Sequence, residues 1–207
     1  MNSRETILAA VQANQPDRVA LPDISIFNTG TKGSLLKFVA TLKGVGGEIS
    51  YVSGYDEITR IILALHGNNV RIVSPIKGLK KLCSDNLIYT TSVHDLQNVE
   101  VAILNAHFGV AENGAVWLAE FDMYYRALPF ITQHLAVTIN ADDIVPTMHQ
   151  AYELISKTNY DFGTFISGPS KTADIEQSLV IGAHGPRTMT VFVLNSGQIG
   201  QVINENS

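Results

Sequence analysis

Residues 101–104 read Val-Ala-Ile-Leu, and residues 189–194 read Met-Thr-Val-Phe-Val-Leu. Neither run shows the regular alternation of apolar and polar side chains that a strand with one solvated face would have. Nearly continuous runs of this kind, rich in β-branched residues, are typical of strands buried on both faces in parallel sheets that helices cover. The two runs therefore predict a mostly parallel sheet covered by helices at the centre of the fold.

Strand-like and helix-like segments alternate along the rest of the chain. Apolar residues at helical spacing predict helices around residues 7–11, 35–42, 58–65 and 144–155. Short apolar runs predict further strands over residues 48–52, 70–74, 115–118, 135–139 and 163–166, with a hairpin near residues 101–119. This order predicts an α/β fold.

No shift in composition along the chain marks a second domain. We expect a single α/β domain over residues 31–207, preceded by an appendage over residues 1–30. The appendage would consist of a short helix and a loop that contains Pro16 and Pro22.

The chain of 207 residues carries few charges. It has 14 basic and 19 acidic residues, a net charge of −5, and a charged fraction of 16%, against about 25% in an average globular chain. The acidic balance argues against a nucleic-acid partner. The low charge fits a membrane protein, or a covered sheet with an interface to another copy of the chain, so a homo-oligomer stays open.

The membrane alternative fails on run length, because a spanning helix needs about 20 predominantly apolar residues. The least charged stretch, residues 188–204, is interrupted by several polar residues. The N-terminus lacks the pattern of a secretory signal. We therefore expect no membrane insertion and a cytoplasmic location. The single cysteine, Cys83, allows no disulfide within the chain, and no cysteine or histidine cluster has metal-binding spacing, so neither a metal nor an iron–sulfur cluster is expected in this chain.

The first candidate site follows the expected strand 163–166. We expect a helix to begin near Lys171 or Thr172, with Ser170 or Thr172 as its cap. Free N–H groups at a helix start bind anions, and Lys171 would add charge; an ordinary capped helix would explain the same residues without a ligand. The candidate residues are Ser167, Gly168, Pro169, Ser170, Lys171, Thr172, Asp174 and Glu176.

The second candidate site lies at the expected C-terminus of that helix. Gly182 or Gly185 would cap the helix, and Pro186 would stop it. His184 and Arg187 could grip an anionic ligand, or they could simply complement the helix dipole.

The third candidate site is a turn. Asn113 and Gly114 form a strong hairpin signal, because both residue types tolerate positive φ. Glu112 on this turn could be a reactive or ligand-binding carboxylate, or it could be an exposed residue of a plain turn.

These segments resemble a known family. Residues 167–176 and 182–187 look like the motifs of the LUD domain, in particular of the LutC/YkgG-like lactate utilisation proteins, and residues 108–115 match an earlier block of that family. The resemblance covers essentially the whole chain and is clearest over residues 101–195. Asn113 and Ala115 depart from the pattern, because the family commonly has hydroxyl residues there.

The resemblance implies the fold of the NagB, RpiA and CoA-transferase proteins. It also implies a role in oxidising L-lactate to pyruvate beside iron–sulfur partner subunits, which must hold the clusters because this chain has one cysteine. The first hypothesis is a LutC-like accessory subunit that binds a small anionic metabolite or cofactor of unknown identity.

Two alternatives remain open. Glu112-Asn-Gly resembles the turn that carries the nucleophilic glutamate of family I CoA transferases, so the chain could be an acyl- or CoA-transferring enzyme. It could also be an assembly scaffold that binds no ligand.

Overall fold

A parallel sheet of five strands forms the centre of the molecule. The computed structural model describes residues 2–27, 33–84, 92–173 and 179–194. The sheet order is β1 (Glu48–Val52), β11 (Thr188–Leu194), β6 (His134–Asn140), β3 (Val101–Asn105) and β2 (Ile72–Val73), and every pairing is parallel. The predicted α/β fold with a mostly parallel sheet is therefore confirmed.

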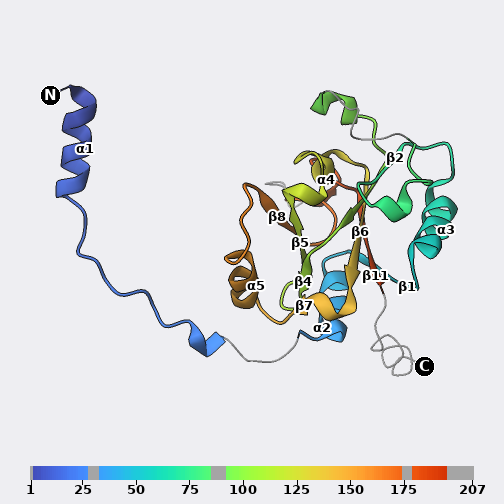
Figure 1. Ribbon diagram of the computed structural model, residues 1–207, viewed down its shortest axis with the longest axis horizontal. Coiled ribbons are helices and arrows are strands. Elements are labelled where there is room, and N and C mark those ends of the chain that lie inside the picture. Colours follow the sequence, from blue (N-terminus) through green and yellow to red (C-terminus); the bar gives the residue numbers. More distant parts are fainter. Residues whose placement is uncertain (1, 28–32, 85–91, 174–178, 195–207) are drawn as a thin grey trace.

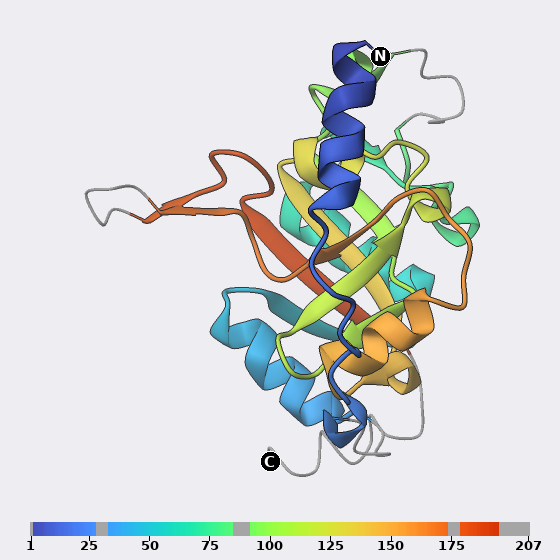
Figure 2. The ribbon, with the colours of Figure 1, turned by 90° about the vertical axis from the view of Figure 1, so that its left-hand side faces the viewer.

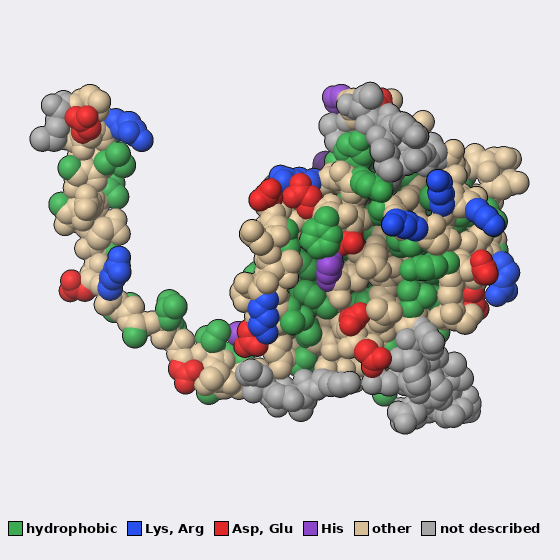
Figure 3. Space-filling view, viewed as in Figure 1, with side chains coloured by type: hydrophobic (Ala, Val, Ile, Leu, Met, Phe, Trp, Pro, Cys, Tyr) green, Lys and Arg blue, Asp and Glu red, His purple; other side chains and the backbone are tan. Residues whose placement is uncertain are grey.

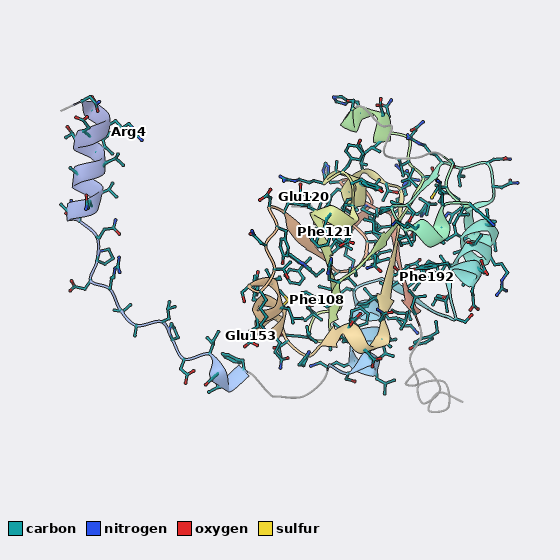
Figure 4. All side chains as sticks on the ribbon, in the orientation of Figure 1. Arg4, Phe108, Glu120, Phe121, Glu153 and Phe192 are labelled. Atoms are coloured by element: carbon teal, nitrogen blue, oxygen red, sulfur yellow. The ribbon has the colours of Figure 1, made fainter. Side chains whose placement is uncertain are left out.

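Both faces of this sheet are buried. On β3, Val101 and Ile103 pack with α3 (Tyr55–His66) on one side, where Phe192 of β11 also lies (Figure 4). Ala102 and Leu104 belong to the cluster on the other side, with α2 (Leu35–Gly44). Because successive side chains of a strand point to opposite faces, a strand covered on both sides is apolar at every position.

A second sheet covers the face of the central sheet on which α2 packs. Its order is β7 (Ile144–Val145), β4 (Phe108–Val110), β5 (Ala115–Ala119) and β8 (Gly163–Ile166). The expected hairpin is the antiparallel pair β4–β5. Helix α5 (Met148–Ile155) packs on the outer face of this sheet, with Ala151 against Phe108 and Trp117. The layers run from α3 through the two sheets to α5 (Figure 1).

The predicted helices near residues 7–11, 35–42 and 58–65 are present as α1 (Ser3–Ala13), α2 and α3. The helix predicted over residues 144–155 begins only at Met148, because Ile144 pairs in β7. Helix α1 buries no residue and lies apart from the rest of the chain (Figure 1). Short helical turns complete the described structure at Ser25–Phe27, Lys77–Leu79, Val93–Leu96, Glu120–Asp122, Leu128–Ile131 (α4) and Ala141–Asp143.

The prediction of a helix that begins near Lys171 is wrong. Residues on either side of 174–178 instead form an antiparallel hairpin of β9 (Lys171–Ala173) and β10 (Leu179–Ile181), which projects from the body in Figure 2. Thr172 pairs with Val180, and Lys171 pairs with Ile181. Thr172, Val180 and Ile181 are β-branched, and β-branched residues favour strands over helices.

Across the described residues, none of the helices combines the length and the apolar character needed to cross a membrane. The same residues contain no group of three or more His, Cys, Asp or Glu side chains arranged to hold a metal ion.

Candidate functional site

The turn that carries Glu112 lies against the start of α5. The Glu112 Oε2 atom accepts a hydrogen bond of 2.8 Å from the backbone N–H of Met148, the first residue of α5. A carboxylate at this position satisfies one of the unpaired N–H groups of a helix start and is favoured by the helix dipole. Glu112 is exposed, and in this arrangement it supports α5.

The rest of the turn connects β4 to β5 as the sequence predicts, with a positive φ at Gly114 but not at Asn113. The Asn113 Oδ1 atom accepts a hydrogen bond of 3.0 Å from the N–H of Ala115. Gly114 has a φ of +68°, and a Cβ atom there would lie 2.7 Å from the backbone nitrogen of Leu42 in α2. Glycine is therefore required at this position both for its φ and for the close approach of α2.

The loop after β8 lies on this turn and on the end of α2. The Ser167 hydroxyl donates to the Asn113 carbonyl oxygen over 2.8 Å. Lys171 donates from Nζ to the carbonyl oxygen of Val45. Gly168 has a φ of +75°, and a Cβ atom there would lie 2.6 Å from the same oxygen. The first and third sequence-predicted segments are thus neighbours in the fold.

The second segment joins the same loop through Ser170. The Ser170 N–H donates to the carbonyl oxygen of Pro186 over 2.8 Å, and the Gly182 N–H donates to the Ser170 carbonyl oxygen over 3.0 Å. A Cβ atom on Gly185 would lie 3.0 Å from the Ser170 Cβ. Gly182 and Gly185 therefore belong to a strand connection, and the prediction that either caps a helix is wrong.

The anion site predicted at a helix start near Lys171 lies on a strand instead. Because Lys171–Ala173 forms β9, these described residues do not present the free N–H groups of the predicted helix start. The basic residues that remain for an anion are Lys171, His184 and Arg187, all of them exposed. Asp174 and Glu176 lie outside the described residues.

The segment that contains His184 and Arg187 lies at the amino edge of the central sheet. Arg187 precedes β11, and its N–H donates over 2.8 Å to the carbonyl oxygen of Gln133, which precedes β6. In open α/β sheets, ligands usually bind at the opposite edge, outside the carboxyl ends of the strands.

A second polar cluster lies at that carboxyl edge, where β3 ends at Asn105. The His107 Nε2 atom lies 2.5 Å from the Asp122 Oδ2 atom, and the His107 ring meets Phe121 edge-on with a centroid distance of 5.0 Å. The hydrogen bond to Asp122 raises the pKa of His107, partial burial opposes this rise, and the charges of Asp122 and Asp143 add to it. Such perturbed groups in a cleft are candidates for a functional site.

Two cavities flank this pair. The first, about 280 Å³, is lined by Tyr55, Pro75, Ile76, Asn105, Phe121, Asp122 and Tyr124. The second, about 310 Å³, lies between His107, Asp143 and the end of α5. Hydrophobic side chains gather on the face of the body beside α5, with a histidine among them (Figure 3), and Figure 4 shows Phe121 on the same side of the body as Phe108.

The sequence reasoning assigned no role to His107 or Asp122. One signal could have found His107. It lies two residues after Asn105, the last residue of β3, and ligands of α/β proteins bind beyond the carboxyl ends of such strands. Asp122 gave no comparable signal, because its place beside His107 depends on the pairing of β4 with β5.

These features define an α/β protein in which a second sheet packs on a parallel sheet and polar residues gather at both edges of the latter. A family model described as LUD domain matches residues 35–194. The chain belongs to the LUD domain family, and the resemblance found in its motifs is confirmed.

Several relatives of known sequence match parts or all of the chain. A protein of Neisseria meningitidis serogroup B, described only as uncharacterized, is 25% identical over 221 residues that cover 94% of each chain. Lactate utilization protein C of Anoxybacillus flavithermus is 37% identical over 64% of this chain and 66% of that protein. The match to lactate utilization protein C of Bacillus pumilus is 36% identical but spans only 38% of that protein.

One solved structure supports the fold. The crystal structure of a DUF162 family protein from Deinococcus radiodurans superposes with a TM-score of 0.57 at 19% sequence identity. The match covers 78% of this chain and 96% of that chain. At this level of identity the likeness concerns the fold alone.

Proposed function

We propose that this chain works in lactate utilisation as a LutC-like accessory subunit, beside iron–sulfur partner proteins that carry the electrons of L-lactate oxidation to pyruvate. The observation that carries the proposal is the match of the LUD domain model to residues 35–194, together with relatives named lactate utilization protein C. The single cysteine of this chain supports the assignment of any iron–sulfur cluster to a partner, because a cluster usually needs four thiolates.

The proposal includes a small anionic ligand held near the joined motif segments. Lys171, His184 and Arg187 are the basic residues of those segments, and all three are exposed. The connection between the motif segments contains Ser167, Gly168, Ser170 and Gly185. This arrangement supports an anion bound at the surface of the connection more than an anion enclosed at a helix start.

Loss of growth on L-lactate tests the pathway. A strain that lacks the gene should fail to grow on L-lactate and should grow normally on pyruvate, and a copy of the gene should restore growth. The purified chain alone should not oxidise L-lactate. Normal growth of the deletion strain on L-lactate would contradict the proposal.

The acyl-transfer alternative depends on Glu112. Its carboxylate already accepts a hydrogen bond from Met148, which favours a structural role over a nucleophile. The variant Glu112→Gln keeps the shape and the acceptor oxygen of the side chain. We expect it to support growth on L-lactate, whereas a nucleophilic role requires complete loss.

The assembly-scaffold alternative is tested by ligand binding. A ligand that binds the native state raises the melting temperature by mass action. L-Lactate, pyruvate and inorganic phosphate should therefore raise the melting temperature of the natural chain more than that of the double variant Lys171→Ala, Arg187→Ala. The absence of a shift in the natural chain would favour the scaffold, whereas equal shifts in both proteins would mean that the ligand binds away from Lys171 and Arg187.

A further inference from the structure

The cavity at the carboxyl edge of the central sheet is lined by aromatic and polar side chains. Tyr55 is the first residue of α3, Pro75 and Ile76 follow β2, and Phe121 and Tyr124 follow β5. Each of the three aromatic side chains is more than one-third exposed. Exposed aromatic rings that line a cavity provide surfaces on which planar rings stack.

The amide of Asn105 is fixed in this cavity as a hydrogen-bond donor. The Thr138 hydroxyl, which is fully buried, donates to the Asn105 Oδ1 atom over 2.9 Å. Because this bond uses the oxygen, the Nδ2 group of Asn105 is left to donate to a ligand.

The carboxylate of Asp122 is fixed as an acceptor. Its Oδ2 atom is held by His107 at 2.5 Å, so its Oδ1 atom is the one left for a ligand. The raised pKa of His107 favours the cationic imidazole, which offsets the Asp122 charge. None of the described residues that line the cavity is Lys or Arg, so the cavity gives an anion little electrostatic attraction.

The backbone of Tyr124 has an unusual conformation. Its φ is +59°, and it is the one described residue other than glycine with a positive φ. A bulky residue rarely adopts this conformation, and such outliers gather at functional sites. The turn that follows β5 thus holds Tyr124 at the cavity against its backbone preference.

We propose that this cavity binds an uncharged planar heterocycle whose edge carries a hydrogen-bond acceptor beside a donor, as aminopyrimidine and aminopurine rings do. The Asn105 Nδ2 group donates to the ring acceptor, and the Asp122 Oδ1 atom accepts from the ring donor. Tyr55, Phe121 and Tyr124 cover the ring faces. The inference is independent of the lactate pathway and uses none of the motif residues.

Calorimetric titration of the full chain tests the proposal. Adenosine and cytidine serve as uncharged probes, and inorganic phosphate serves as the anionic comparison. We expect saturable binding of at least one nucleoside. The variants Asn105→Asp, Asp122→Asn and Tyr124→Ala should each weaken that binding by about 10-fold or more, because each removes a fixed hydrogen bond or a stacking ring.

A matched control comes from α5. Tyr152 is also an exposed aromatic residue, but it does not line this cavity. Tyr152→Ala should leave nucleoside affinity unchanged. Circular dichroism should verify that each variant is folded; if Asp122→Asn unfolds, the other two variants carry the test.

Three outcomes would overturn the proposal. The first is that neither nucleoside binds at about 1 mM, the weak end of ordinary affinities. The second is that binding survives all three cavity variants unchanged. The third is that phosphate competes with the nucleoside for the same site, since a site built for an uncharged ring would not hold it.

Discussion

His107 is a residue whose titration reports the structure around it. Its pKa is raised mainly by the hydrogen bond to Asp122. We expect the ring protons of His107 to titrate in nuclear magnetic resonance with a midpoint above 6.5, and Asp122→Asn should lower that midpoint. A midpoint at or below 6.5 in the natural chain would contradict the geometry of the pair.

The sign of the effect on stability follows from the direction of this shift. A raised pKa in the folded state means that the pair stabilises the fold fully below pH 6.5. That contribution is lost as the pH rises through the raised pKa of His107. His66 provides a control, because burial and the neighbouring His134 lower its pKa, so its midpoint should lie below 6.5.

Gly114 makes a second prediction at the scale of one residue. Gly114→Ala should lower the free energy of unfolding by more than about 1 kcal/mol, because it forces a positive φ and brings Cβ within 2.7 Å of Leu42. Gly44→Ala is the matched control, since nothing lies within 4 Å of a Cβ atom there. Urea unfolding should show no loss for Gly44→Ala; equal losses in both variants would refute this explanation.

At the scale of the element, the stretch after β8 shows where local sequence misleads. Ser170, Thr172, Asp174 and Glu176 have the composition of a capped helix start, and sequence reasoning predicted one. The pairing of Thr172 with Val180 makes Lys171–Ala173 a strand instead. The residues around Thr172 give no local signal of its pairing with Val180. Asn113-Gly114 does give a local signal, because a tight turn depends only on its own residues.

Helix α5 depends on a residue from another element. The Glu112 carboxylate accepts from the N–H of Met148 at the start of the helix. Glu112→Ala should therefore reduce stability by about 1 kcal/mol, the usual cost of a lost helix cap. Glu153→Ala, at an exposed position near the other end of α5, should change it by less than about 0.5 kcal/mol. Equal effects in chemical denaturation would argue against the capping role.

At the scale of the molecule, two short runs predicted the central sheet because burial on both faces makes most residues of β3 and β11 apolar. The second sheet was only half predicted. β5 and β8 are apolar runs, but the two-residue β7 is too short to be recognised, and Ile144 also fits the stripe of α5. The His107–Asp122 pair depends on this sheet, so the carboxyl-edge cavity could not be built from sequence alone.

The N-terminal segment carries the last prediction. We propose that residues 1–30 are an appendage to a domain formed by the rest of the chain, since α1 buries no residue, and Val19 and Leu21 are 86% and 93% exposed. Removal of residues 1–23 should leave a single cooperative unfolding transition with a free energy within about 0.5 kcal/mol of the full chain. Leu42→Ala, at a fully buried position, should cost about 2–5 kcal/mol in the same measurement. A loss of that size on truncation would mean that the segment covers part of the domain in solution.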